Sequence, residues 1–168
     1  MTDATRPGDR ATPSVAPAAE PSAAPVGVPA SVHLRDGENG PGVVPTFYEQ
    51  IGGRPTFQKL VHEFYLGIAA DPVLKPMYPE EDLGPAEERL TLFLEQYWGG
   101  PGTYSAQRGH PRLRLRHQPF KVNPDARDRW LLHMRHAVDT LALSPLDDAT
   151  LWDYLERAAF AMVNTFDD

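Results

Sequence analysis

The sequence predicts an all-α protein, and three observations lead to this fold class. From residue 46 onward, apolar residues recur every three to four positions over stretches of roughly 13 to 20 residues, the period of amphipathic helices. No stretch of useful length alternates apolar and polar residues, as a half-buried strand would. Proline, glycine and capping residues stand between the apolar stretches, where helices are expected to begin and end.

The composition limits the kind of protein. A chain of 168 residues is long enough for one domain with a sizeable core, and its net charge of −7 disfavours nucleic acid as the main partner. Without cysteine, the chain cannot form disulfides or Cys-ligated zinc and iron–sulfur sites. No apolar run approaches the ~18 residues of a membrane span, and prolines interrupt the short apolar runs where a signal peptide would need continuity. We therefore expect a soluble, cytoplasmic protein that does not bind membranes.

The first 45 residues differ from the rest of the chain. They hold 8 of the 18 prolines, and Ala, Ser and Gly fill most of the remainder. Neither a helical nor a strand period is visible there. We expect residues 1–45 to be a disordered, partly polyproline-like tail, and residues 46–168 to be the folded domain.

Local signals place the helices in order. Thr46 is a candidate N-cap for a short helix, because Glu49 completes a capping-box pattern three residues later. A long helix is expected over 54–69 and a short one over 72–75, with Pro72 in the first helical position. The next helices are expected over 85–97, over 125–141 after Asn123, and over 145–164 after Ser144.

The segment between the 85–97 and 125–141 helices is the most irregular part of the domain. Gly99-Gly100-Pro101 cannot continue a helix, and a polar loop follows. A short helical turn is permitted over 112–118, where Leu113 and His117 would share one face. An imidazole at the end of such an element suits a metal or cofactor ligand, although a lone histidine there is more often solvated or a cap.

Four aromatic residues with polar tips lie on or beside the predicted core faces: Tyr65, Tyr78, Tyr97 and Trp130. Each carries an O–H or N–H group that needs a partner when it is buried, although ordinary core packing explains any one of them alone. The long loop and His117, with no competing metal cluster, change the interpretation of the set. Together they indicate a haem pocket, with His117 on the iron and the phenol and indole donors opposite.

Several longer motifs are specific to one family. They are FY at 64–65, MYPEEDL at 77–83, FLEQYWGGPGTYSAQRGHPRLRLRH at 93–117 and RDRW at 127–130. Residues 46–166 thereby resemble the group II truncated haemoglobins, most closely the actinobacterial, oxygen-binding, haemoglobin O-like type. The resemblance implies a shortened globin fold in which two helices cross over two others around haem b.

The resemblance also implies roles for individual residues. His117 would be the proximal iron ligand, while Tyr65, Tyr78 and Trp130 would form the distal polar group. Ala86 stands where many globins have a distal histidine. The remaining expected cofactor contacts are Leu90 and Phe93 on the haem, Arg116 and Tyr104 at its propionates, and Tyr97 and Leu113.

Arginines 108, 112, 114 and 116 form a basic cluster that, taken alone, resembles a nucleic-acid patch. The acidic net charge and the family resemblance favour haem propionates and surface ion pairs as their partners instead.

The resemblance implies a protein that binds dioxygen and other diatomic ligands, in oxygen transport or buffering. Dioxygen on haem iron gains partial negative charge, and each donor hydrogen bond to it is worth ~1–3 kcal/mol, so release should be slow. The alternative is an enzyme, a nitric oxide dioxygenase or a peroxidase, working with an unidentified reductase. A gas sensor whose tail contacts a partner is a third interpretation. The sequence leaves open the physiological ligand, carbon monoxide included, and whether the chain forms a homo-oligomer.

Overall fold

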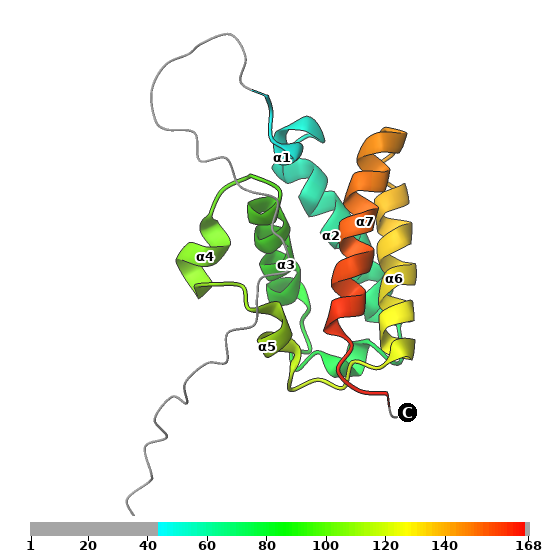
Figure 1. Cartoon of the computed structure of the whole chain (residues 1–168). Coiled ribbons are helices and arrows are strands. Elements are labelled where there is room, and N and C mark those ends of the chain that lie inside the picture. Colours follow the sequence, from blue (N-terminus) through cyan, green and yellow to red (C-terminus); the bar gives the residue numbers. More distant parts are fainter. Residues whose placement is uncertain (1–43, 167–168) are drawn as a thin grey trace, which may run out of the picture. The chain divides into compact units, whose positions relative to one another are not determined.

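The computed structural model describes residues 44–166, and every regular element in that range is helical (Figure 1). The predicted tail over 1–45 lies almost entirely outside the described residues. The elements are α1 (Phe47–Gln50), α2 (Arg54–Ala70), the 3₁₀ turn η1 (Lys75–Met77), α3 (Gly84–Tyr97), α4 (Thr103–Arg108), α5 (Leu113–His117), α6 (Pro124–Asp139) and α7 (Pro145–Met162). The all-α prediction is confirmed.

Four long helices form two layers. Helix α2 packs against both α3 and α6, and α6 packs against α7. The α2–α3 pair thus lies over the α6–α7 pair, which is the predicted two-over-two arrangement (Figure 1). Within the described range, no helix is both long enough and apolar enough to cross a membrane.

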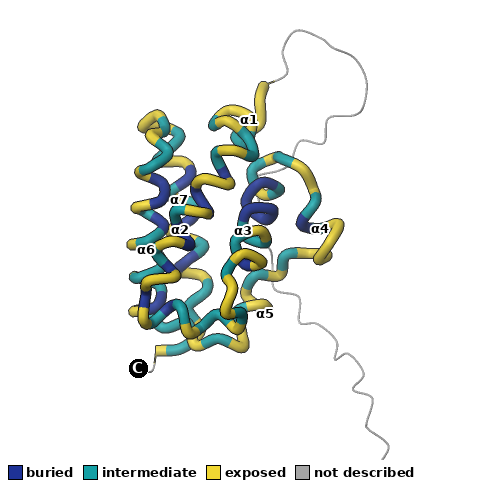
Figure 2. Tube along the Cα trace, turned by 180° about the vertical axis from the view of Figure 1, so that it is seen from behind, coloured by how far each residue is buried: buried dark blue, intermediate teal, exposed yellow. Residues whose placement is uncertain are grey.

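The core is centred on α2, whose buried stripe follows the helical period through Phe57, Leu60, Val61, Phe64 and Ile68. Met134, Ala137 and Val138 of α6, the helix that packs against α2, are also buried. The buried parts of the helices are dark blue in Figure 2. Complete burial of each large apolar side chain contributes about 1.5–3 kcal/mol, so this contact dominates the packing.

Capping residues begin the helices where the sequence predicts. The Thr46 hydroxyl accepts from the Glu49 amide at 3.3 Å, and the Thr46 amide donates to the Glu49 carboxylate at 2.9 Å, which completes the capping box. Asn123 accepts from the Ala126 amide at 2.9 Å to begin α6. Ser144 accepts from an amide of the first turn of α7. Each of these caps satisfies a backbone donor that has no partner inside the helix.

Two local predictions were wrong. The helix expected over 72–75 is a turn followed by η1, because the Asp71 carboxylate accepts from the amides of Val73 (2.8 Å) and Leu74 (2.9 Å) and directs the chain away from a regular helix. The polar loop after α3 contains the unpredicted helix α4. There the Gln96 side chain accepts from the Ser105 amide at 2.9 Å, a contact that local periodicity cannot reveal.

Candidate functional site

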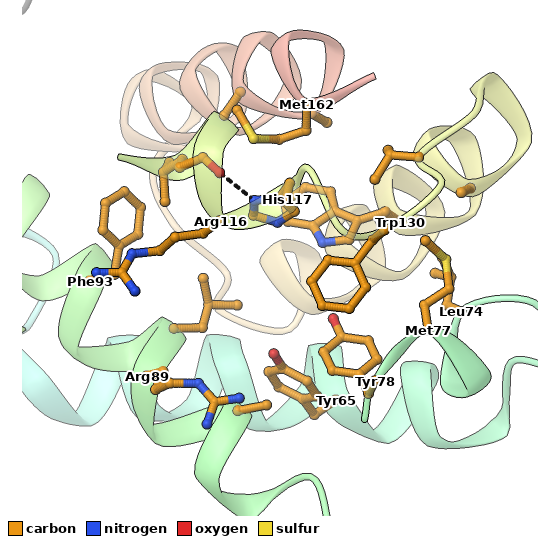
Figure 3. Close-up of a pocket in the computed structure, with 18 of the residues that line it drawn as sticks. Tyr65, Leu74, Met77, Tyr78, Arg89, Phe93, Arg116, His117, Trp130 and Met162 are labelled. Atoms are coloured by element: carbon orange, nitrogen blue, oxygen red, sulfur yellow. Dashed lines mark hydrogen bonds between the residues drawn. The ribbon is translucent and has the colours of Figure 1, made fainter. Parts of the chain in front are cut away.

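A cavity of about 730 Å³ lies between the two helical layers and the α5 segment. Its walls are mostly apolar, with Leu74, Met77, Leu90, Phe93, Leu155 and Met162 among the residues that line them. Polar side chains also reach it: the phenols of Tyr65 and Tyr78, the Trp130 indole and the His117 imidazole, which Figure 3 shows, and four arginines, of which Arg89 and Arg116 are labelled there. The size and the lining are those of a site for a largely apolar organic molecule.

The structure brings ten of the eleven predicted site residues to this cavity: Tyr65, Tyr78, Ala86, Leu90, Phe93, Tyr104, Leu113, Arg116, His117 and Trp130. Tyr97 does not line it. Its ring stacks on Tyr154 with centroids 3.9 Å apart, and it is 37% exposed. Tyr154, on which Tyr97 stacks, does line the cavity.

The histidine wall of the cavity consists of α5 and its imidazole. His117 Nδ1 lies 2.7 Å from the carbonyl oxygen of Leu113, one turn earlier (Figure 3). A carbonyl can only accept, so Nδ1 carries the proton and Nε2 keeps its lone pair. This hydrogen bond from Nδ1 fixes the ring orientation and the tautomer. Histidines that ligate metals are oriented in the same way, by a hydrogen bond from the nitrogen that does not bind the metal.

The donor wall consists of Tyr65 from α2, Tyr78 from the segment after η1, and Trp130 from α6. The rings of Tyr65 and Tyr78 meet edge to face at 5.7 Å, and their hydroxyls point into the cavity (Figure 3). The ring of Phe64, which is fully buried, packs 5.2 Å from that of Trp130. Burial raises the pKa of Tyr65 and that of Tyr78, so both phenols remain protonated donors throughout the physiological range.

Three of the four arginines that reach the cavity, Arg89, Arg116 and Arg127, already bind other groups of the protein. Arg116 donates from Nε to the Pro111 carbonyl at 2.8 Å and from Nη2 to the Arg108 carbonyl at 2.9 Å. Arg89 pairs with Glu80 at 2.9 Å. Arg116 therefore holds the loop before α5 in addition to any contact with a bound anion.

Several cavity residues were not predicted as site residues. Arg89 and Arg127 lie on the polar flanks of their helices, where the sequence predicts solvent exposure, so periodicity gives no signal for them. On α7, Leu155, Ala158, Ala159 and Met162 also line the cavity, and Leu155 and Ala159 are at the same time buried core residues. The paired alanines were the available signal, because small side chains on a core face leave space that another group can fill.

The chemistry of this lining fits haem. The apolar walls suit a flat macrocycle, the imidazole offers one nitrogen lone pair as an axial ligand, and the arginines supply positive charge for two carboxylates. His117 would hold the iron, and the donor wall would face a ligand on it.

Comparison with known proteins gives consistent matches. Residues 46–164 match the family model of bacterial-like globins. The chain is 40% identical over 117 residues to group 2 truncated hemoglobin YjbI of Bacillus subtilis, covering 70% of this chain and 87% of that protein.

Two solved structures extend the likeness. A thermostable hemoglobin from the actinobacterium Thermobifida fusca is 65% identical with a TM-score of 0.71, covering 72% of this chain and 98% of that one. The hemoglobin of Chloroflexus aurantiacus is 48% identical with a TM-score of 0.70, covering 73% and 100%. The chain therefore belongs to the bacterial-like globin family, as a truncated haemoglobin of group II.

Proposed function

We propose that this globin binds dioxygen reversibly at the iron of haem b, with His117 as the proximal ligand and Tyr65, Tyr78 and Trp130 as donors to the ligand. That the protein is an oxygen-binding haem globin follows from its family. The roles of individual residues are the proposal. The observation that carries it is the placement of an oriented imidazole and three hydrogen-bond donors around one largely apolar cavity.

The proximal role of His117 is supported by its tautomer and its position. The carbonyl of Leu113 holds the proton on Nδ1, so Nε2 is the nitrogen that can bind iron. His62 and His136, by contrast, are exposed residues of α2 and α6 and do not line the cavity.

The distal role of the donor wall is supported by burial and by the absence of another donor at Ala86. Ala86 is 3% exposed and lines the cavity, but a methyl group cannot donate a hydrogen bond to a ligand. Tyr65 is 6% exposed, and its pKa is raised by burial and by the neighbouring Tyr78. Haem, when bound, supplies the iron on which dioxygen acquires partial negative charge. Donors already oriented in a mostly apolar cavity stabilise that charge.

The test is an absorption spectrum of the purified full chain, reduced and then exposed to dioxygen or carbon monoxide, followed by stopped-flow dissociation of each ligand. We expect one haem per chain, a stable oxygen spectrum and slow oxygen release. A chain that purifies without haem, and takes up none when haem is supplied, would contradict the proposal. Fast turnover of nitric oxide or peroxide with a supplied reductase would instead assign the same site to an enzyme.

A further inference from the structure

Beyond the cavity, one exposed side chain after the C-terminal end of α7 binds the segment that carries His117. We propose that Asn164 is a positioning residue for His117, which fixes the distance and tilt at which the imidazole meets the iron. The inference rests on the proposed function, because it presupposes that His117 is the proximal ligand.

The Asn164 carboxamide makes three hydrogen bonds to this segment. Its Nδ2 donates to the carbonyl of His117 at 3.1 Å and to that of Phe120 at 2.9 Å. Its Oδ1 accepts from the Val122 amide at 3.0 Å. The backbone adds a fourth bond, from the Asn164 amide to the Val122 carbonyl at 3.0 Å.

The segment that carries His117 needs these hydrogen bonds because neither helix length nor burial stabilises it. Helix α5 has five residues, none of them buried, which is far below the ~12–15 residues that an isolated helix needs in water. Pro119 lacks an amide hydrogen and cannot extend the helix. The carbonyl of His117 lies in the last turn, where helix carbonyls lack an intrahelical donor, and it accepts from the Asn164 side chain as well as from the Phe120 amide.

The chemistry of a carboxamide suits this position. It presents two N–H donors and a carbonyl acceptor in one plane, and here all three act on a single short loop. A carboxylate of the same size keeps the acceptor but loses both donors, and turns negative charge towards two carbonyl oxygens. A glutamine keeps the amide on a longer stem. Substitution by aspartate and by glutamine therefore separates the effect of hydrogen bonding from that of side-chain size.

Arg116 supports the other end of the same helix by donating to the carbonyls of Arg108 and Pro111. Two side chains therefore hold the backbone of the segment that carries the His117 imidazole. One is Arg116 of α5 itself, and the other is Asn164, which lies 47 positions after His117. Motion at the end of α7 would accordingly be transmitted to the iron through His117.

The experiment compares Asn164→Ala, Asn164→Asp and Asn164→Gln with Ser144→Ala, which removes the cap at the opposite end of α7. The readouts are the iron–histidine stretching band of the reduced, ligand-free protein, the rate of haem transfer to an apoglobin acceptor, and the dissociation rates of dioxygen and carbon monoxide. We expect Asn164→Ala to shift and broaden the iron–histidine band and to accelerate haem loss about tenfold, the equivalent of one to two net hydrogen bonds.

The two gas dissociation rates should change by the same factor in Asn164→Ala, because a proximal change acts on the iron and not on ligand charge. Asn164→Asp should shift the iron–histidine band and accelerate haem loss at least as much as Asn164→Ala does. Asn164→Gln should restore part of the wild-type band. Ser144→Ala should lower stability and leave the band unchanged. If the Asn164→Ala chain does not fold, the test is whether Asn164→Asp shifts the iron–histidine band more than Asn164→Gln does. A larger shift in Asn164→Asp supports the positioning role, and an equal or smaller one contradicts it.

An unshifted band in the folded Asn164 variants, or a shift no larger than that of Ser144→Ala, would overturn the positioning role while leaving haem binding by His117 intact. If His117→Ala kept a normal haem complement, the proposed function itself would fail. The two failures are therefore distinguishable.

Discussion

The donor wall and the histidine wall face one cavity but are held in place by different forces. Tyr65 belongs to a helix of 17 residues, and its neighbour Phe64 is fully buried and packs on Trp130. His117 belongs to a helix of five residues with no buried member, held by hydrogen bonds from Arg116 and Asn164. Burial positions one wall, and side chain to backbone hydrogen bonds position the other. Substitutions on the donor wall should therefore change both the folding stability and the ratio of the dioxygen and carbon monoxide dissociation rates. Substitutions on the histidine wall should change haem retention and alter the dissociation rates of both ligands by the same factor.

The largest test of this contrast is His117→Ala. We expect stable haem binding to be lost, because His117 is the one imidazole that lines the cavity among residues 44–166. Haem content by absorption spectroscopy measures the result. His136→Ala on the exposed face of α6 is the matched control and should bind haem normally. An unchanged Soret band in His117→Ala would show that the histidine wall has been misassigned.

A second test measures how strongly burial supports each wall. Phe64→Ala should lower the free energy of unfolding by about 3–5 kcal/mol, the usual cost of removing a buried phenylalanine. Leu115 of α5 is 54% exposed, and Leu115→Ala should change the free energy of unfolding by less than about 0.5 kcal/mol. Urea unfolding of both variants measures the difference. Similar losses from the two substitutions would remove the contrast.

A third test asks whether Trp130 acts as a donor. Trp130→Phe keeps most of the apolar packing and removes the indole N–H, so we expect oxygen release to accelerate roughly tenfold, or ~1–3 kcal/mol. Carbon monoxide carries less negative charge on the iron, and its release should change less. Stopped-flow measurements on both ligands distinguish this from the Asn164 variants. Equal acceleration would identify Trp130 as a steric barrier.

The smallest expected effect concerns the contact between Asp71, at the C-terminal end of α2, and His133 of α6. Burial alone would raise the pKa of Asp71, but hydrogen bonds from His133 and from the amides of Leu74 and Val73, with the Arg129 charge, lower it to about 2. The ionised carboxylate therefore stabilises the fold above its unfolded pKa of ~3.9, and this stability is lost as the pH falls towards 2.

Asp71→Asn should accordingly cost about 1–2 kcal/mol at pH 7, because it weakens hydrogen bonds to a charged acceptor. The difference from wild type should shrink between pH 4 and pH 2. Thermal unfolding across this range measures it, and a difference independent of pH would show that the Asp71 charge does not contribute.

The donor wall was largely predictable from the sequence because two of its three residues lie on long periodic helices. Tyr65 and Trp130 follow from the stripes of α2 and α6, and caps such as Thr46 follow from residue type. The supports of the histidine wall were not predictable. The bonds from Asn164 and the Gln96–Ser105 contact that accompanies α4 join residues whose proximity depends on the finished fold. Tyr97 shows the reverse error, since an apolar stripe does not indicate which of its members reaches a cavity and which stacks behind another ring.

Gly67 determines how closely α2 and α6 approach. A Cβ at this position would overlap the imidazole of His133, whose Nε2 donates to Asp71 at 2.8 Å. Glycine within a helix costs about 1 kcal/mol relative to alanine, so the chain gives up helix stability at this position. Gly67 lies two residues after Tyr65, and His133 lies three residues after Trp130. A larger side chain at Gly67 would therefore displace His133 or push α2 and α6 apart, and these are the helices that carry Tyr65 and Trp130.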